Sequence, residues 1–180
     1  RLGAEPLAGA TLSLMVFFMT WVFCFGVVMA TAALASQAFG ARKPRMIRRV
    51  IRQGFWVTVI LTVPSMIAFQ YTPDLLRVMS QPPEILPHAD AYMSTLMCSL
   101  MPCIGFVVVR NFISSLNRPS PALWVMLAGV PLNGLLDYAL IFGNFGMPRL
   151  ELVGAGIATS VINWLMFLVL LAIAAFAKPF

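Results

Sequence analysis

Five apolar segments, each long enough to cross a lipid bilayer, restrict the fold of this chain more than any other feature. About 20 apolar residues are enough for one helix to span the hydrocarbon layer. The first segment carries no charged residue between Glu5 and Arg42. The predicted spans are residues 12–39, 53–71, 85–115, 121–143 and 153–177. Lipid offers no hydrogen-bond partners, so the backbone N–H and C=O groups of each span must bond to one another, as they do in an α-helix. The sequence therefore predicts an all-α integral membrane protein that crosses the bilayer five times.

The basic residues gather on one connection between the spans. Only 10% of the residues are charged, against about 25% in soluble domains, and the net charge is +6. Six cations follow the first span: Arg42, Lys43, Arg45, Arg48, Arg49 and Arg52. The positive-inside rule places this connection in the cytoplasm. The predicted inner segments are residues 40–52, 116–121 and the C-terminal end, and the predicted outer segments are residues 1–11, 71–90 and 144–152. The membrane therefore accounts for the net charge without a nucleic-acid partner.

Small residues at four-residue spacing predict two surfaces for close helix packing. The first-span set comprises Gly26, Ala30, Ala32, Ser36 and Gly40. The last-span set comprises Gly154, Gly156, Ala158 and Ser160. Pro64 predicts a kink in the second span, because proline interrupts the backbone hydrogen bonds of a helix. Residues 72–90 are expected to form a short amphipathic turn on the outer side.

The residue types that usually bind metals give no sign of a metal site. Cys24, Cys98 and Cys103 are odd in number, lie in apolar segments and have no neighbouring histidine. A thiol in such a setting behaves as a small buried hydrophobic side chain. His88 is the single histidine, and we expect it to be a solvated residue of the outer turn.

The segment PLNGLLDYALIFG, residues 131–143, contains the strongest candidate for a functional residue. An acidic side chain near the middle of a bilayer costs about 2.5–3.5 kcal/mol on insertion scales, so Asp137 indicates a proton or cation site. Asn133 lies four residues earlier, on the same helix face. Pro131 has no backbone N–H and leaves the carbonyl of Leu127 without its usual partner. The alternative is a structural acid that is hydrogen-bonded at a helix interface or wetted at the surface.

The last span carries two polar side chains on the same helix face. Thr159 and Asn163 are four residues apart and are the best partners on offer for Asp137 and Asn133. The alternative, equally open from the sequence, is that they bond to neighbouring backbone groups.

Four pieces of the chain resemble the multidrug and toxic compound extrusion (MATE) transporters. PLNGLLDYALIFG and the following NFGMPRLELVGAGIATS are similar to that family's fifth and sixth helices. LGAEPLAGATLS and GVVMATAALASQAFGAR are similar to its second helix and the basic loop after it. The resemblance implies that residues 1–180 are helices two to six of a twelve-helix carrier, a partial N-terminal lobe. A start at Arg1 and an apolar end at Phe180 fit a piece of a longer protein.

The resemblance also implies a function. It implies secondary active multidrug efflux, in which organic and often cationic compounds are exchanged for H⁺ or Na⁺ by alternating access. Asp137, Asn133 and Thr159 match the family's cation or proton site; if Na⁺ is the coupling ion it would bind at Asp137 and Asn133, and helix bending is expected at Pro131. The protein would then be a monomer of the bacterial inner membrane and no enzyme, with no cofactor besides the coupling ion. The family's first helix, which carries another acidic residue of that site, is not in this sequence.

Three other classes compete with a drug carrier. A lipid-linked oligosaccharide flippase of the same superfamily would need several cations for a pyrophosphate, and the spans offer only Arg110, expected to snorkel to the cytoplasmic face. An intramembrane protease would need two facing carboxylates, a base beside a nucleophile, or clustered metal ligands. A purely structural module would leave the cost of Asp137 unexplained.

Overall fold

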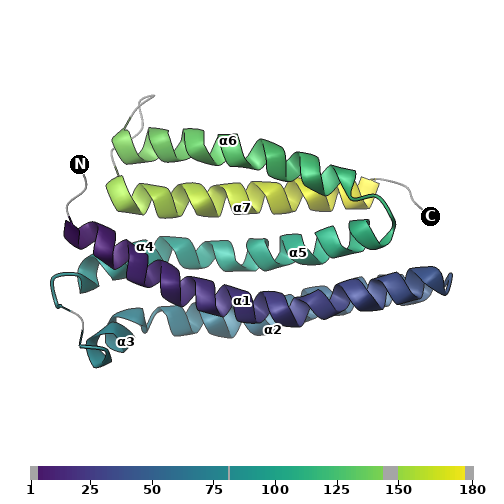
Figure 1. Cartoon of the computed structure of the whole chain (residues 1–180), viewed down its shortest axis with the longest axis horizontal. Coiled ribbons are helices and arrows are strands. Elements are labelled where there is room, and N and C mark those ends of the chain that lie inside the picture. The colour runs from purple at the N-terminus through teal and green to yellow at the C-terminus, as the bar shows by residue number, and fades with distance from the viewer. Residues whose placement is uncertain (1–3, 81, 144–149, 177–180) are drawn as a thin grey trace.

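The structure, a computed structural model, describes residues 4–80, 82–143 and 150–176, and the side chains from Leu7 onward. The described part is a bundle of long helices that run roughly parallel to one axis (Figure 1). The helices are α1 (Ala4–Gly40), α2 (Pro44–Phe69), α3 (Thr72–Val78), α4 (Leu86–Leu96), the 3₁₀ turn η1 (Met97–Ser99), α5 (Leu100–Ser115), α6 (Ser120–Phe142) and α7 (Glu151–Phe176).

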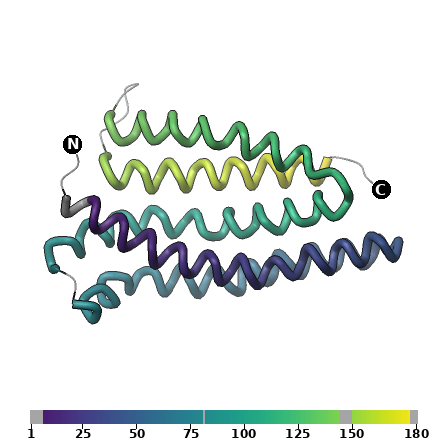
Figure 2. Tube along the Cα trace, viewed as in Figure 1, coloured from purple at the N-terminus to yellow at the C-terminus, as the bar shows by residue number. Residues whose placement is uncertain are grey.

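Five helices in the described residues are long and apolar enough to cross a membrane, which confirms the predicted number of spans. α4, η1 and α5 together form the third span, Leu86–Ser115. Successive spans alternate in direction, so that α1 starts at one end of the bundle and α7 finishes at the other (Figure 2). The all-α membrane fold is therefore as the sequence predicted.

The basic connection is much shorter than predicted. Only residues 41–43 separate α1 from α2, which begins at Pro44. Proline is favoured in the first turn of a helix, because its fixed φ suits the helix and its missing N–H would have no partner there. Arg45, Arg48, Arg49 and Arg52 consequently lie on the first turns of α2 rather than in a loop.

The outer connection, predicted as a turn, contains helix α3 and the beginning of α4. Pro73 lies in the first turn of α3, and Asp74 and Arg77 form an exposed ion pair of 3.3 Å within it. His88 lies in the first turn of α4 and is partly buried, so its expected place in a solvated turn was wrong. Pro87, just before it, lies in the first turn of α4, which begins at Leu86, one residue after the start predicted for the third span.

The third span is the core of the bundle. α5 packs against α1 and α2 on one side and against α7 on the other, and α6 reaches the bundle through α7. Two hydrophobic clusters result, one centred on Leu100 and Ile104, the other on Val109 and Leu170. The 3₁₀ turn η1 precedes Pro102, whose missing N–H leaves the carbonyl of Cys98 without its α-helical partner.

One of the two predicted packing surfaces is confirmed. Gly154, Gly156, Ala158 and Ser160 of α7 are buried. A Cβ on Gly154 would lie 2.8 Å from the carbonyl oxygen of Leu140, so only glycine permits this approach of α7 to α6. Ser160 donates a hydrogen bond of 2.6 Å to the carbonyl of Thr95 and ties α7 to α4.

The other predicted packing surface has no partner within the described residues. Gly26, Ala30, Ser36 and Gly40 are exposed, and a Cβ on Gly26 or Gly40 would meet no described atom within 4 Å. The buried face of α1 instead carries Cys24, Val28, Ala35 and Ala38. Spacing defines a stripe on a helix, but the rotation of the helix about its axis decides whether that stripe faces a neighbour.

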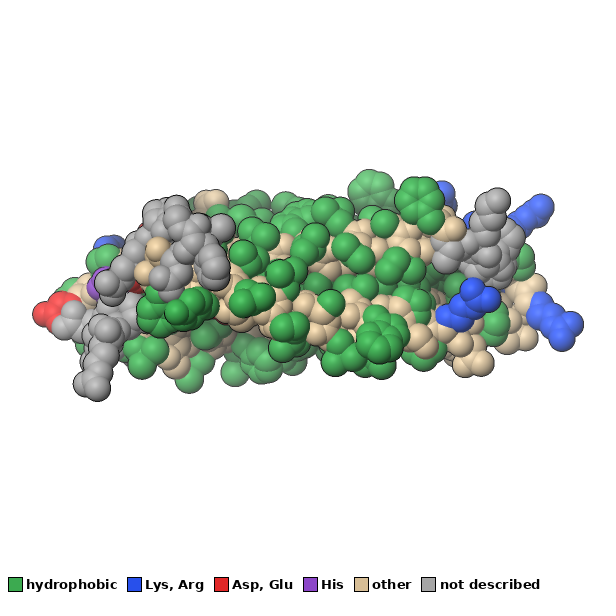
Figure 3. Space-filling model, turned by 90° about the horizontal axis from the view of Figure 1, so that it is seen from above, with side chains coloured by type: hydrophobic (Ala, Val, Ile, Leu, Met, Phe, Trp, Pro, Cys, Tyr) green, Lys and Arg blue, Asp and Glu red, His purple; other side chains and the backbone are tan. Residues whose placement is uncertain are grey.

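Charged side chains mark the two ends of the bundle, with an apolar wall between them (Figure 3). Most of the Lys and Arg side chains in this view gather at one end, whereas Asp, Glu and His, together with one basic side chain, lie at the other. This separation is the pattern of a membrane-spanning bundle. The orientation with the basic end in the cytoplasm stays a prediction.

Candidate functional site

Asn133 and Asp137 form a hydrogen-bonded pair on α6. The amide Nδ2 of Asn133 donates to Oδ2 of Asp137 at 3.1 Å. Both side chains are partly buried. The spacing of four residues places them on one helix face, so the predicted neighbourhood of the two side chains is confirmed. Their function as an ion site is a separate question.

Each member of the pair keeps one oxygen without a protein partner. Oδ1 of Asn133 and Oδ1 of Asp137 are buried and accept no hydrogen bond within the described part of the chain. Buried polar atoms are normally bonded, so one unpaired acceptor on each member of a hydrogen-bonded pair needs an explanation. Oxygen atoms of this kind are what a proton or a hard cation such as Na⁺ would bind.

Pro131 lies inside α6, six residues before Asp137. The helix continues through this proline from Ser120 to Phe142, and it ends at Gly143 in the left-handed conformation with φ of 72°. The missing N–H at Pro131 removes one helical hydrogen bond close to the Asn133–Asp137 pair. The local backbone is therefore less restrained where the polar pair lies.

Thr159 does not make the predicted contact with Asp137. Its hydroxyl donates to the carbonyl of Ala155 on its own helix at 2.9 Å. A threonine inside a helix often bonds the carbonyl four residues back, so this was the alternative left open by the sequence. Thr159 nevertheless lines the same cavity as Asn133 and Asn163.

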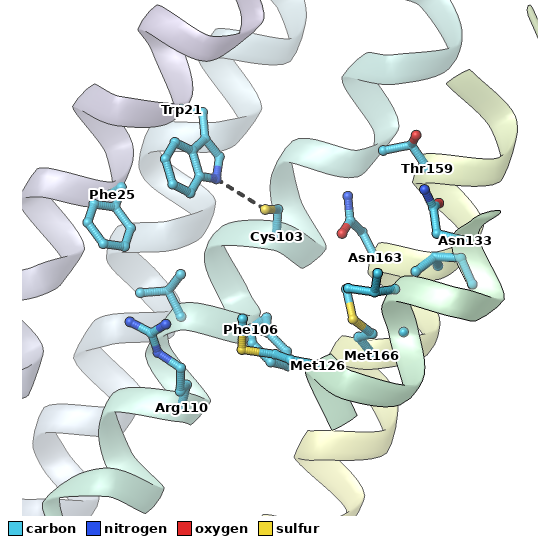
Figure 4. Close-up of a pocket in the computed structure, with 14 residues that line it drawn as sticks. Trp21, Phe25, Cys103, Phe106, Arg110, Met126, Asn133, Thr159, Asn163 and Met166 are labelled. Atoms are coloured by element: carbon cyan, nitrogen blue, oxygen red, sulfur yellow. Dashed lines mark hydrogen bonds between the residues drawn. The ribbon is translucent and has the colours of Figure 1, made fainter. Parts of the chain in front are cut away.

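A cavity of about 510 Å³ lies between α1, α5, α6 and α7 (Figure 4). Its walls are mainly apolar, with an aromatic side on α1 and two methionines on α6 and α7. The lining residues are Trp21, Phe25, Cys103, Phe106, Val107, Arg110, Met126, Gly129, Val130, Asn133, Thr159, Ile162, Asn163 and Met166. Asp137 is not one of them, so Asn133 is the residue that joins the cavity to the carboxylate.

The aromatic side of the cavity was not predicted from the sequence. The rings of Trp21 and Phe25 stack with centroids 5.0 Å apart. The indole N–H of Trp21 donates to Sγ of Cys103 at 3.1 Å, which joins α1 to α5. The Trp21–Cys103 contact joins residues 82 positions apart, so no local sequence pattern predicts it.

Arg110 was expected to snorkel toward the cytoplasmic face, but it lines the cavity. Figure 4 shows its guanidinium directed into the space near Phe25 and Phe106. Side chains on a helix lean toward its N-terminus, and for α5 that direction leads away from the basic end of the bundle. Arg110 is the single charged residue of the lining.

The cysteines differ in their surroundings. Cys24 is buried and Cys103 partly buried, but Cys98 is exposed, so the expectation of burial was wrong for Cys98. It lies in the 3₁₀ turn, between the buried Leu96 and Ser99. Among the described residues, no three His, Cys, Asp or Glu side chains gather as a metal site would require.

Comparison with known proteins identifies relatives along the whole chain. The profile of the MatE family matches residues 1–139. A protein of Bradyrhizobium diazoefficiens named probable multidrug resistance protein NorM is 41% identical over 180 residues, which cover 100% of this chain and 39% of that protein. The protein of the same name from Rhodopseudomonas palustris is 42% identical, with 100% of this chain and 38% of that protein covered.

Two solved structures share the fold. A crystal structure of a mutant MATE protein superposes with a TM-score of 0.88 at 22% identity, over 99% of this chain and 40% of that chain. The inward-facing conformation of a multidrug resistance MATE family transporter of the MOP superfamily gives 0.86 at 23% identity, with the same shares covered. The chain thus spans about two fifths of the length of the relatives it matches.

Proposed function

Because this chain belongs to the MatE family, we propose that the full-length protein is a secondary active carrier that exports organic compounds in exchange for H⁺ or Na⁺. The names of its bacterial relatives support multidrug export. The observation that carries the proposal is the Asn133–Asp137 pair, which has two unpaired oxygens and of which Asn133 lines a cavity of drug-like size. We also propose a location in the bacterial inner membrane, which the bacterial relatives and the five apolar spans support, and a monomeric state.

The coupling ion binds at Asp137 in this proposal. An ionised carboxylate inside the membrane is costly, and a bound proton or Na⁺ removes that cost. A proton needs only one oxygen, whereas a hard cation takes a larger oxygen shell, so Na⁺ would need ligands beyond these two side chains. Each charge that crosses the membrane contributes about 2.3 kcal/mol per 100 mV.

Asn133 transmits the state of Asp137 to the cavity. Its amide N–H₂ bonds the carboxylate, and the same side chain forms part of the cavity lining. When an ion occupies Asp137, the carboxylate is a weaker acceptor and the amide is free to rotate. Bending of α6 at Pro131, where one backbone hydrogen bond is absent, would then change the shape of the cavity. Rocking of two lobes around such a site gives alternating access.

The cavity suits aromatic organic compounds. Its volume of about 510 Å³ lies within the usual range for small-molecule sites, about 300–1,000 Å³. Trp21 and Phe25 offer flat surfaces for stacking, and the flexible Met126 and Met166 adapt to different shapes. Figure 4 shows Arg110 and Asn133 on opposite sides of this space, so a cationic group would bind on the Asn133 side, away from the guanidinium.

The same lining weighs against the flippase alternative. A pyrophosphate carries several negative charges and needs several cationic partners. Within the described residues, Arg110 is the only cation that lines the cavity, and the other lining polar groups are two uncharged amides, a hydroxyl, a thiol and an indole N–H. We therefore retain drug export as the proposed function.

The test is Asp137→Asn in the full-length protein, assayed by dye efflux in everted membrane vesicles with the H⁺ and Na⁺ gradients imposed separately. Efflux driven by the coupling ion is expected to disappear, because the amide cannot exchange a proton and carries no charge for Na⁺. Asp74→Asn is the matched control, since Asp74 is an exposed acid of α3 whose ion pair with Arg77 contributes little. Unchanged efflux in the Asp137 variant, at equal abundance in the membrane, would remove this residue from the mechanism.

A further inference from the structure

The basic end of the bundle carries charge that the protein itself does not neutralise. Six cations lie between Arg42 and Arg52, and Arg118 follows in the turn between α5 and α6. The described acidic residues lie elsewhere: Asp74, Glu84, Asp90 and Glu151 toward the other end, and Asp137 within α6. Among the described residues, none of these seven cations forms an ion pair. Their counter-charges must therefore come from outside this part of the chain.

Two of these cations border a groove on α2. The groove has a volume of about 430 Å³ and is lined by Arg48, Ile51, Arg52, Phe55, Trp56 and Val59. The lining forms two neighbouring rows of residues spaced four apart, one with Arg48, Arg52 and Trp56, the other with Ile51, Phe55 and Val59. From Arg48 to Val59 the groove extends roughly 16 Å along the helix axis, at 1.5 Å per residue.

The groove changes from charged to apolar along its length. Arg48 and Arg52 are exposed at the basic end. Trp56 follows one turn deeper and is 63% exposed. Tryptophan is favoured where headgroups meet hydrocarbon, because its ring is apolar and its N–H is polar. A ligand that fills the whole groove must therefore have an anionic head and an apolar tail.

The floor of the groove is held by packing. Phe55 packs against the cluster around Val109 and Leu170, and its ring meets that of Phe167 edge to face at 6.3 Å between centroids. Its position is therefore fixed by residues of α5 and α7 behind it. A groove with a fixed floor binds its ligand with a smaller loss of conformational entropy.

We propose that this groove binds one anionic phospholipid of the leaflet at the basic end, with the phosphate between Arg48 and Arg52 and one acyl chain along Ile51, Phe55 and Val59. Charge complementarity selects this occupant: basic residues next to a membrane helix attract anionic lipid headgroups, and an arginine pair matches a phosphate. A soluble anion would use the two guanidinium groups and leave the apolar part empty. The site lies on a different face from the drug cavity and does not depend on the transported compound.

The experiment titrates delipidated full-length protein in detergent with phosphatidylglycerol and counts bound lipids by native mass spectrometry. Arg48→Gln with Arg52→Gln is expected to weaken phosphatidylglycerol binding at least about tenfold, given about 1 kcal/mol for each cation at a membrane surface. The matched control is Arg45→Gln with Arg49→Gln, which removes the same charge from the same turns of α2 at positions outside the groove. The control is expected to change binding by less than about twofold.

Two further measurements identify the ligand and its place. Phosphatidylcholine is expected to bind at least about tenfold more weakly than phosphatidylglycerol, and inorganic phosphate is expected not to displace the lipid. Phosphatidylglycerol brominated on its acyl chains is expected to quench part of the tryptophan fluorescence. This quenching is expected to be lost in Trp56→Phe. Equal losses in the two double variants would show diffuse attraction, and displacement by phosphate would show a bare anion site. Unchanged phosphatidylglycerol binding in the groove variant would show that the lipid does not bind there and that another part of the protein covers the groove. Each of these three results overturns the proposal.

Discussion

Two asparagines on neighbouring spans illustrate how the same side chain serves two purposes. Asn111 of α5 donates across a helix interface to Oγ1 of Thr31 on α1 at 3.3 Å, with the sulfur of Met29 at 3.9 Å. Asn133 of α6 donates within its own helix to Asp137. The first bond joins two helices, whereas the second joins none and leaves two buried oxygens unpaired. The first asparagine joins two helices, whereas the second belongs to the pair that we propose as the ion site.

The largest expected effect comes from breaking the bond on α6. Asn133→Ala in the full-length protein removes the donor from Asp137, and a hydrogen bond to a charged group contributes about 1.5–3 kcal/mol. The concentration of H⁺ or Na⁺ that gives half-maximal efflux is therefore expected to change by about 10- to 100-fold. The measurement is dye efflux against imposed ion concentration, with membrane abundance recorded for each variant.

Asn163→Ala is the matched control for that variant. Asn163 is an amide that lines the same cavity, and it has no recorded hydrogen bond to Asp137. It is expected to alter dye affinity while the ion dependence stays near that of the native protein. Equal shifts of the ion dependence in the two variants would mean that the Asn133–Asp137 bond has no special part in coupling.

A smaller effect, on stability rather than on ion dependence, is expected for the asparagine of α5. Asn111→Ala and Thr31→Val each remove one side of the bond between α5 and α1. Side-chain hydrogen bonds between membrane helices average about 0.6 kcal/mol, with about 1.7 kcal/mol as an upper value. A double-mutant cycle of unfolding free energies is expected to give a coupling energy in that range. A coupling of zero would mean that the contact contributes nothing to holding α1 against α5.

The features that the sequence predicted correctly are local ones. Membrane spans follow from unbroken apolar runs, and the Asn133–Asp137 contact follows from a spacing of four residues on one helix. The cavity wall was missed because the contact of Trp21 with Cys103 depends on two helices far apart in the sequence. The direction of Arg110 was misjudged for a related reason. Rotation of a helix about its axis is set by tertiary packing, which spacing alone does not reveal.

The smallest expected effect is that of Thr159→Val, which also tests whether residues outside the Asn133–Asp137 pair take part in ion coupling. The hydroxyl of Thr159 bonds the carbonyl of Ala155, which is already part of the backbone ladder of α7, so Thr159→Val removes no contact between helices. Stability is expected to change by less than about 0.5 kcal/mol, as for substitutions away from packing and polar networks. If Thr159 serves only as cavity lining, the ion dependence of efflux should stay unchanged. A shift of the ion dependence as large as that of Asn133→Ala would show instead that the hydroxyl turns toward Asp137 during the transport cycle. The proposed ion site would then include a residue of α7 as well as the pair on α6.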